Sequence, residues 1–206
     1  MRNLFIWLVA GFLLASHAHA ETPEKTIVVF GDSLTAGYGL DGSAAFPVRL
    51  EAALKQRGHR VRVINAGVSG DTSAGGAARL EWSLADRPDL LIVELGGNDA
   101  LRGLSPQQTR KNLAAILSGS KAGGIRTILA GMKAPRNLGE DYYTSFDALY
   151  PELADEYDVA LYPFFLAGVA GRAELNQPDG IHPNRAGVEV IVEGILPLVE
   201  KQLAGR

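Results

Sequence analysis

The sequence has 206 residues, of which 47% are hydrophobic and 21% are charged, and its formal net charge is -3. This balance excludes the strongly basic surface of nucleic-acid-binding proteins and the low hydrophobicity of disordered chains. None of the residues is a cysteine, so disulfides, thiolate nucleophiles and thiolate metal ligands are excluded as well.

Residues 1–20 have the order of a secretory signal. Arg2 precedes an apolar run over 4–15, and small residues precede the cleavage that we expect after Ala20. The remaining residues, 21–206, would form one domain of net charge about -4, located in the periplasm or secreted. The apolar run is shorter than the roughly 20 residues of a membrane span, so we expect no stable membrane insertion after cleavage. The alternative is an uncleaved N-terminal anchor.

From residue 26 onward, strand-like and helix-like segments alternate. The β-type runs cover 26–30, 61–65, 90–95, 127–132 and 160–162, and the helical segments cover 46–57, 76–86, 106–122, 142–157 and 184–203. This alternation predicts an α/β fold with a five-stranded, doubly wound parallel sheet and helices on both faces. Ser105 before Pro106 indicates one helix start, and Asp141 or Asn184 could begin the later helices.

The first three strands run into loops of glycine and small polar residues, at 31–34, 65–72 and 96–99. Ligands of such sheets bind beyond the carboxyl ends of the strands, so these loops share the edge where a site is expected. Ser33, directly after the first strand, is the candidate nucleophile. A serine needs a base that removes its proton and donors that stabilise the resulting oxyanion.

The histidines limit the choice of base. The chain has four, of which His17 and His19 would leave with the signal. His59 precedes the second strand at the opposite edge of the sheet, and we interpret it as a solvated loop residue. His182 follows Asp179 by three residues, and a carboxylate on one ring nitrogen would orient the imidazole as a base. The alternative is a helix-start loop in which Asp179 only caps and His182 is structural.

Three groups could stabilise an oxyanion: the Ser33 amide, the Gly67 amide and the Asn98 side chain. For the loops that contain Gly67 and Asn98, the alternative is that these residues only shape ordinary turns. For residues 67–76, a phosphate-binding loop is a further alternative. That loop lacks the Lys-Ser/Thr ending of a P-loop and the spacing of a dinucleotide fingerprint, which disfavours nucleotide binding.

Other polar and aromatic residues near these loops have plainer interpretations. Asp32 adjoins Ser33 and should point elsewhere along an extended segment, so we interpret Asp32, Asp71 and Asp99 as acids that shape loops. Five aromatic residues could line an acyl groove or could simply be packing residues: Tyr38, Tyr142, Tyr143, Phe164 and Phe165.

Four blocks of the sequence resemble the signature blocks of the SGNH hydrolases, also called the GDSL family. They are Gly-Asp-Ser-Leu at 31–34, the glycine at 67, Gly-Gly-Asn-Asp at 96–99 and Asp-Gly-Ile-His-Pro at 179–183. The resemblance implies Ser33 as nucleophile, His182 as base and Asp179 as its orienting acid. It also implies oxyanion donation by the Ser33 amide, the Gly67 amide and the Asn98 side chain, a three-layer flavodoxin-like fold, and no metal or cofactor.

The longer stretches 93–104 and 179–185 are similar to a bacterial branch of multifunctional esterases in this family. That similarity implies an exported, monomeric serine esterase that acts on small-molecule substrates: aryl esters, short to medium acyl esters, acyl-CoA thioesters and lysophospholipids. One departure is the segment 131–135, which is more apolar in that branch and bears on acyl-chain preference. The alternatives are a carbohydrate acetylesterase with the same machinery and a non-catalytic lipid- or glycan-binding module.

Overall fold

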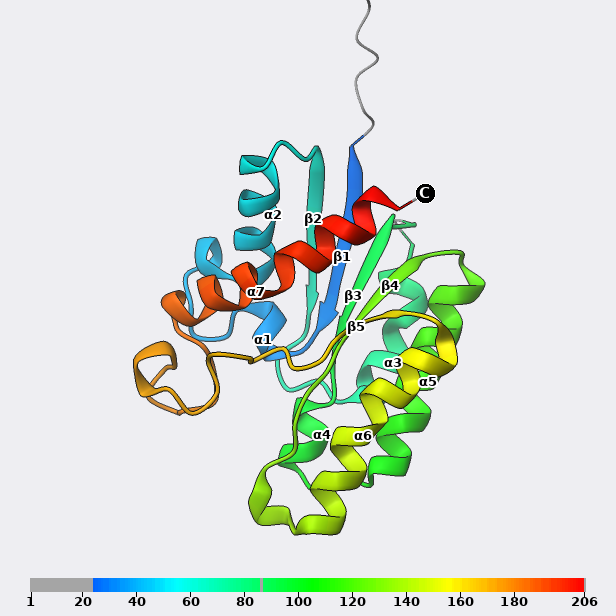
Figure 1. Ribbon diagram of the computed structural model, residues 1–206, viewed down its shortest axis with the longest axis vertical. Helices are drawn as coiled ribbons and strands as arrows, with labels where there is room; N and C mark the ends of the chain where they lie inside the picture. Colours follow the sequence, from blue (N-terminus) through cyan, green and yellow to red (C-terminus); the bar gives the residue numbers. More distant parts are fainter. Residues whose placement is uncertain (1–23, 86, 206) are drawn as a thin grey trace, which may run out of the picture.

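The structure is a computed structural model that describes residues 24–85 and 87–205. Its centre is one sheet of five parallel strands in the order β2-β1-β3-β4-β5 (Figure 1). The strands are β1 (Lys25–Gly31), β2 (Val61–Gly67), β3 (Leu90–Glu94), β4 (Arg126–Ala130) and β5 (Ala160–Tyr162). The predicted α/β fold with a five-stranded parallel sheet is therefore confirmed. The expected signal segment, 1–20, lies outside the described residues, and its cleavage stays a prediction.

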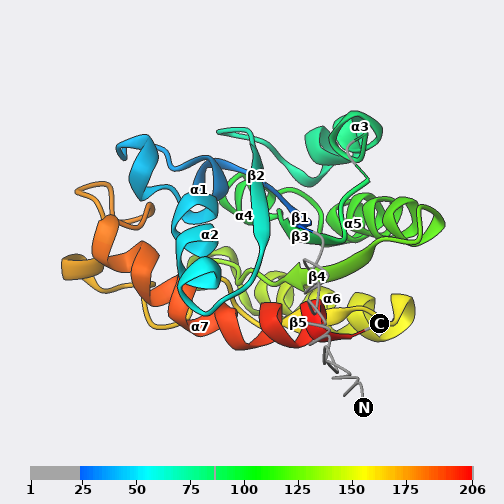
Figure 2. The same cartoon turned by 90° about the horizontal axis from the view of Figure 1, so that it is seen from above.

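Helices cover both faces of the sheet and complete the three layers (Figure 2). One face carries α2 (Phe46–Gln56) and α7 (Arg185–Ala204), which pack on each other. The other carries α3 (Ser73–Ser83), α5 (Pro106–Ala122) and α6 (Glu140–Tyr157), with α5 between its two neighbours. This division follows from right-handed crossovers, because the chain reverses its direction across the sheet after β2. None of the helices in the described part of the chain is long and apolar enough to cross a membrane.

Several element boundaries differ from the predicted ones. Two short helices, α1 (Ser33–Ala36) and α4 (Gly97–Leu101), were not predicted. Helix α6 begins at Glu140 after Gly139, so the expected start at Asp141 is wrong. Ser105 does precede α5, but its hydroxyl donates to Gln107 instead of capping the helix. Asn184 caps α7 as expected, because its side chain accepts from Gly187 N at 3.1 Å.

The core is formed by the strands and the helix faces that cover them. Every residue of β3 is buried, as are Ile27 to Gly31 of β1. Burial of each large aliphatic or aromatic side chain stabilises the folded state by roughly 1.5–3 kcal/mol. Because the chain has no cysteine and so no disulfides, its stability depends on this burial. Phe165, one of the aromatic residues singled out above, belongs to this core and packs edge-on against Phe46 at 5.0 Å. The core holds the carboxyl ends of β1, β2 and β3 side by side.

Candidate functional site

Ser33 lies where β1 stops and α1 begins. The turn is tight at Gly31, where an added Cβ would come within 2.1 Å of Thr35 Oγ1 and 2.5 Å of Glu94 Oε2. Asp32 caps α1 by accepting from Leu34 N at 2.9 Å. A glycine and a capping acid thus turn the chain sharply and direct the Ser33 side chain to the carboxyl edge of the sheet.

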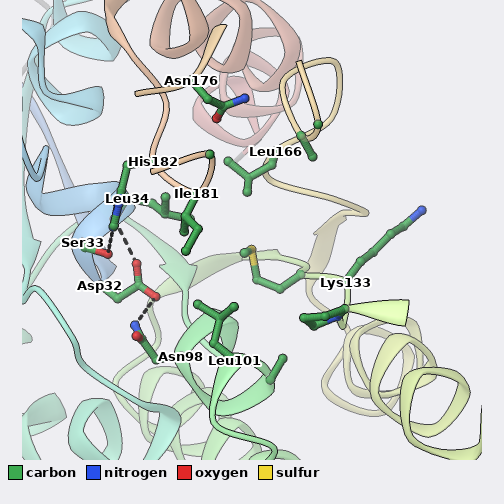
Figure 3. Close-up of a pocket in the computed structure, with 17 residues that line it drawn as sticks. Asp32, Ser33, Leu34, Asn98, Leu101, Lys133, Leu166, Asn176, Ile181 and His182 are labelled. Carbon is green, nitrogen blue, oxygen red and sulfur yellow. Dashed lines mark hydrogen bonds between the residues drawn. The ribbon is translucent and has the colours of Figure 1, made fainter. Parts of the chain in front are cut away.

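The loop before α7 brings His182 to this serine. Nε2 of His182 lies 2.9 Å from Ser33 Oγ (Figure 3). Its Nδ1 lies 2.7 Å from Asp179 Oδ2. The other carboxylate oxygen of Asp179 accepts from the backbone N–H groups of Ile181 and His182 at 2.9 and 3.0 Å. These hydrogen bonds lower the pKa of Asp179 to about 2, and the bond from the His182 backbone N–H has the largest effect. A carboxylate on Nδ1 leaves Nε2 free to accept the serine proton.

Asn98 faces the same space from the third loop. Gly96 has φ +110°, a conformation that a side chain would strain, and it lets the chain turn from β3 into α4. The Asn98 amide then donates to Asp32 Oδ2 at 3.0 Å and to the carbonyl oxygen of Asp71 at 2.9 Å. Two acceptors on one amide nitrogen fix the orientation of this side chain beside Ser33.

Gly67 ends β2 directly opposite Gly31. A Cβ at position 67 would come within 2.4 Å of Ala36 N and 2.9 Å of the Asp32 carbonyl oxygen, so only glycine allows β2 to approach the turn that carries Ser33. The Gly67 N–H donates to Asn65 Oδ1 at 2.9 Å. The structure thus brings Gly67 against the turn that carries Ser33, with the Gly67 amide already bonded to a side chain of its own loop.

Two buried carboxyl groups lie beneath the serine. Asp32 is 2% exposed and faces Asn98, so the expectation that it points elsewhere is wrong. Burial raises its pKa from the ordinary 3.8 to about 6. Glu94 of β3 is fully buried; Oε2 accepts from Thr35 Oγ1 at 2.8 Å, while Oε1 has no partner in the described part of the chain. Burial, and then the charge of Asp32, raise the pKa of Glu94 well above its usual range.

Sequence reasoning missed Glu94. The available signal was one acid within an otherwise apolar strand, immediately before the loop that carries Asn98. A carboxyl group at such a position is completely removed from water, so it needs either a hydrogen-bond partner or a proton.

Comparison with known proteins identifies the family. The sequence profile of the GDSL-like lipase/acylhydrolase family matches residues 29–190. The chain belongs to this family. The resemblance inferred from the four sequence blocks is confirmed, and with it the assignment of the protein to a family of hydrolases.

Named relatives of this GDSL-family chain align over most of its length. Esterase TesA of Pseudomonas aeruginosa is 40% identical over 95% of this chain and 98% of its own. Thioesterase 1/protease 1/lysophospholipase L1 of Escherichia coli is 42% identical over 89% of this chain and 87% of its own. Among solved structures, the SGNH-hydrolase family esterase AlinE4 is 49% identical, covers 89% of this chain and 99% of its own, and has a TM-score of 0.75.

In this GDSL-family protein, Arg79 of α3 ties the loops of the site together. Its guanidinium donates to the carbonyl oxygens of Gly31 at 2.9 Å and Ala66 at 2.8 Å, and its Nε lies 2.7 Å from Asp71 Oδ2. It also lies 4.1 Å from the centre of the Phe30 ring. One side chain therefore connects the ends of β1 and β2 to the loop whose carbonyl holds Asn98.

Asp99 and His59 lie outside the hydrogen-bonded group of Ser33, His182 and Asp179. Asp99 accepts from Ser73 and Thr109 and so joins the ends of α3, α4 and α5, as the loop-shaping interpretation requires. His59 lies at the amino edge of the sheet, as expected, but it is not only solvated: its Nε2 lies 3.1 Å from Glu200 Oε1 of α7. No cluster of three or more potential metal ligands occurs among the described residues.

A cavity of about 210 Å³ opens beside Ser33 (Figure 3). Its wall combines Asp32, Asn98 and His182 with apolar side chains and one lysine, Lys133. None of the five aromatic residues suggested as groove residues lines it. Tyr38 instead packs on the His182 ring at 4.7 Å, and the Tyr142 hydroxyl donates to the Leu104 carbonyl oxygen. The apolar wall is aliphatic, and it lies within reach of the serine.

Proposed function

We propose that this protein is an exported serine esterase that hydrolyses small carboxylic esters and acyl thioesters through an acyl-enzyme on Ser33. The observation that carries the proposal is the hydrogen-bonded series Ser33 Oγ, His182 and Asp179, with contacts of 2.9 and 2.7 Å. The names of the relatives, esterase and thioesterase/lysophospholipase, support the same substrate classes.

The reaction begins when Ser33 Oγ attacks the carbonyl carbon of the ester or thioester. His182 Nε2 takes the hydroxyl proton, and the Asp179 carboxylate stabilises the imidazolium that forms. When the tetrahedral intermediate collapses, His182 returns the proton to the leaving alcohol or thiol. A water molecule then attacks the acyl group with His182 as base, and the released acid leaves Ser33 protonated again.

Oxyanion donors in this proposal are the Ser33 N–H, the Gly67 N–H and the Asn98 amide. The Gly67 N–H already donates to a neutral acceptor, Asn65 Oδ1, and the Asn98 amide donates to the neutral Asp71 carbonyl oxygen as well as to Asp32 Oδ2. A hydrogen bond to a charged oxygen is roughly twice as strong as one to a neutral oxygen, so the developing oxyanion would compete well for both donors. The resting contacts hold the donors in place until that charge appears.

The cavity bears on the size of the acyl group. Clefts that enclose drug-sized ligands are roughly 300–1,000 Å³, and this one is about 210 Å³. Apolar side chains such as Leu101, Leu166 and Ile181 form much of its wall. Short to medium acyl chains therefore fit the enclosed space, and longer chains would extend into solvent.

Hydrolysis of p-nitrophenyl butyrate by a chain of residues 21–206 tests this proposal. We expect Ser33→Ala to lower kcat/KM by about 10⁴-fold and to abolish covalent labelling by an alkyl phosphonate, read as a mass increase on the peptide that contains Ser33. Ser118→Ala, at an exposed position of α5, is the matched control and should retain both. Unchanged activity in Ser33→Ala would refute the nucleophile assignment, and a folded protein inactive on all esters would favour a binding module.

A further inference from the structure

One cation lines the cavity, on the side away from the nucleophile. Figure 3 shows Ser33, His182 and Asn98 together at one side of the cavity. Lys133 lies at the other side, and its side chain points away from Ser33. The side chains of Leu101 and Leu166 lie between them. A ligand joined to Ser33 at one end could thus reach the ammonium group only across an apolar segment.

The backbone at Lys133 is held in place by Asp147 of α6. The Ala134 N–H donates to Asp147 Oδ1 at 2.9 Å, and Arg136 Nη2 lies 2.8 Å from Asp147 Oδ2. Both oxygens of this carboxylate are therefore occupied by groups that follow Lys133 in the chain. The loop is anchored, and its acid neutralises the neighbouring arginine instead of the lysine.

The ammonium group of Lys133 is left without a carboxylate partner in the described part of the chain. Its contact there is the Phe164 ring, whose centre lies 5.3 Å from Nζ. Two arginines that adjoin cavity-lining residues do have carboxylate partners. Arg136 pairs with Asp147 at 2.8 Å, and Arg172 pairs with Glu174 at 3.5 Å. An aromatic face orients a cation without neutralising it, so Lys133 keeps its charge available for a ligand.

We propose that Lys133 recognises an anionic group of the substrate, a carboxylate or a phosphate that an apolar segment separates from the scissile carbonyl. The inference rests on the proposed esterase function and assigns to it a residue that selects among its substrates. The anion could belong to the acyl part, as the far carboxylate of a dicarboxylic half-ester. It could equally belong to the leaving group, as the phosphates of a CoA thioester.

Matched substrate pairs distinguish these two sources. The first arm compares the mono-p-nitrophenyl ester of suberic acid with p-nitrophenyl octanoate, and the second compares hexanoyl-CoA with S-hexanoyl-N-acetylcysteamine. In each pair the scissile bond is the same and only one partner carries the anion. The measured quantity is the ratio of kcat/KM for the anionic partner to that for the neutral partner.

We expect Lys133→Gln to lower this ratio by about fivefold in at least one arm, mainly through KM, because a partly exposed ion pair contributes up to about that factor. Lys133→Arg should largely restore the ratio, and Lys133→Glu should lower it further. Salt at about 1 M, where the Debye length is about 3 Å, should lower the wild-type ratio. Lys111→Gln, at an exposed position of α5, is the matched control and should leave both ratios unchanged.

A decrease in the first arm alone assigns the anion to the acyl part, and a decrease in the second alone assigns it to the leaving group. Ratios that are the same in Lys133→Gln and wild type in both arms would overturn the proposal. Ser33-dependent hydrolysis of p-nitrophenyl octanoate in the same experiment would show that the esterase function stands even so. If none of the four substrates is hydrolysed, the esterase proposal fails and this inference fails with it.

Discussion

Two histidines of the described chain contact a carboxylate, and they lie at opposite edges of the sheet. His182 Nδ1 lies 2.7 Å from Asp179, and His59 Nε2 lies 3.1 Å from Glu200. Asp179 and His182 are three positions apart in one loop, whereas His59 and Glu200 join the segment before β2 to α7. The decisive difference is at the other ring nitrogen, because His182 Nε2 lies 2.9 Å from the Ser33 hydroxyl.

A carboxylate partner is therefore not what distinguishes His182, the proposed base, from His59. His59 and Glu200 form a contact between packed elements, and Arg57 shares the same carboxylate at 3.2 Å. At the other edge, the loops after three strands converge around one serine. The comparison indicates that the position of a pair in the sheet, relative to a nucleophile, decides its chemistry.

The largest expected effect separates the two histidines. His182→Ala should lower kcat/KM for p-nitrophenyl butyrate by about 10⁴-fold, because the serine loses its base. His59→Ala should lower it by less than about twofold. Steady-state kinetics of the two purified variants provide the check, and equal losses would break the comparison.

The two carboxylates give the next test. Asp179→Asn should lower kcat by about 10³-fold, because an amide cannot stabilise the imidazolium and favours the wrong tautomer. Glu200→Gln should leave kcat unchanged within about twofold. Both substitutions keep the shape of the side chain, so a large loss in Glu200→Gln would show that the distant pair affects the reaction.

Asn98 tests whether donors converge at the carboxyl edge. Asn98→Ala should lower kcat by about 10²-fold with a smaller change in KM, since an oxyanion donor acts in the transition state. Asn137→Ala, at an exposed position outside the cavity, is the control. A loss confined to KM would indicate that Asn98 binds the substrate without stabilising the oxyanion.

Asp32 provides a test by pH. Its pKa is raised from 3.8 to about 6, so folding favours the protonated acid. Its contribution to stability is complete below pH about 4 and is lost as the pH rises through about 6. Relative to wild type, the free energy of unfolding of Asp32→Asn should therefore increase by about 2 kcal/mol between pH 4 and pH 7.

Urea unfolding at several pH values measures this difference. Asp155→Asn, at an exposed position of α6, is the matched control for the loss of one carboxyl group. A constant difference for Asp32→Asn would contradict the raised pKa and the burial that causes it.

The smallest expected effect is on stability at the amino edge. Glu200→Gln removes the charge that His59 and Arg57 share, and all three side chains are partly exposed. The free energy of unfolding should fall by less than about 1 kcal/mol. Thermal unfolding of the variant checks this, and a greater loss would mean that the pair stabilises the fold more than exposed ion pairs usually do.

Much of this organisation could be predicted from the sequence. The apolar runs of β1 and β3 and the glycine-rich loops after them identified the edge that carries Ser33 and Asn98. Asp179 and His182 were also accessible, because their interaction is local in the chain. Strands covered on both faces and short-range side-chain contacts leave clear marks in a sequence.

The missed features depend on contacts between distant segments. Helices α1 and α4 have four and five residues, too few to show a helical period. The Asp32 side chain is held by Leu34 N, which is two residues away, and also by Asn98, which is 66 residues away along the chain. The environment of Glu94 likewise depends on Thr35 of α1, which is 59 residues away along the chain. Such geometry becomes visible only when the strands have been assembled.

The contacts of Arg79 have a consequence for where this site can assemble. Cross-links between loops of exported proteins are commonly disulfides, which require an oxidising compartment and a folding catalyst. This chain has no cysteine, and a guanidinium joins Gly31, Ala66 and Asp71 instead. Charge-assisted hydrogen bonds form and break without electron transfer. The edge that carries Ser33 therefore has no thiol or disulfide that a reductant could change, and an added reductant would leave its geometry intact.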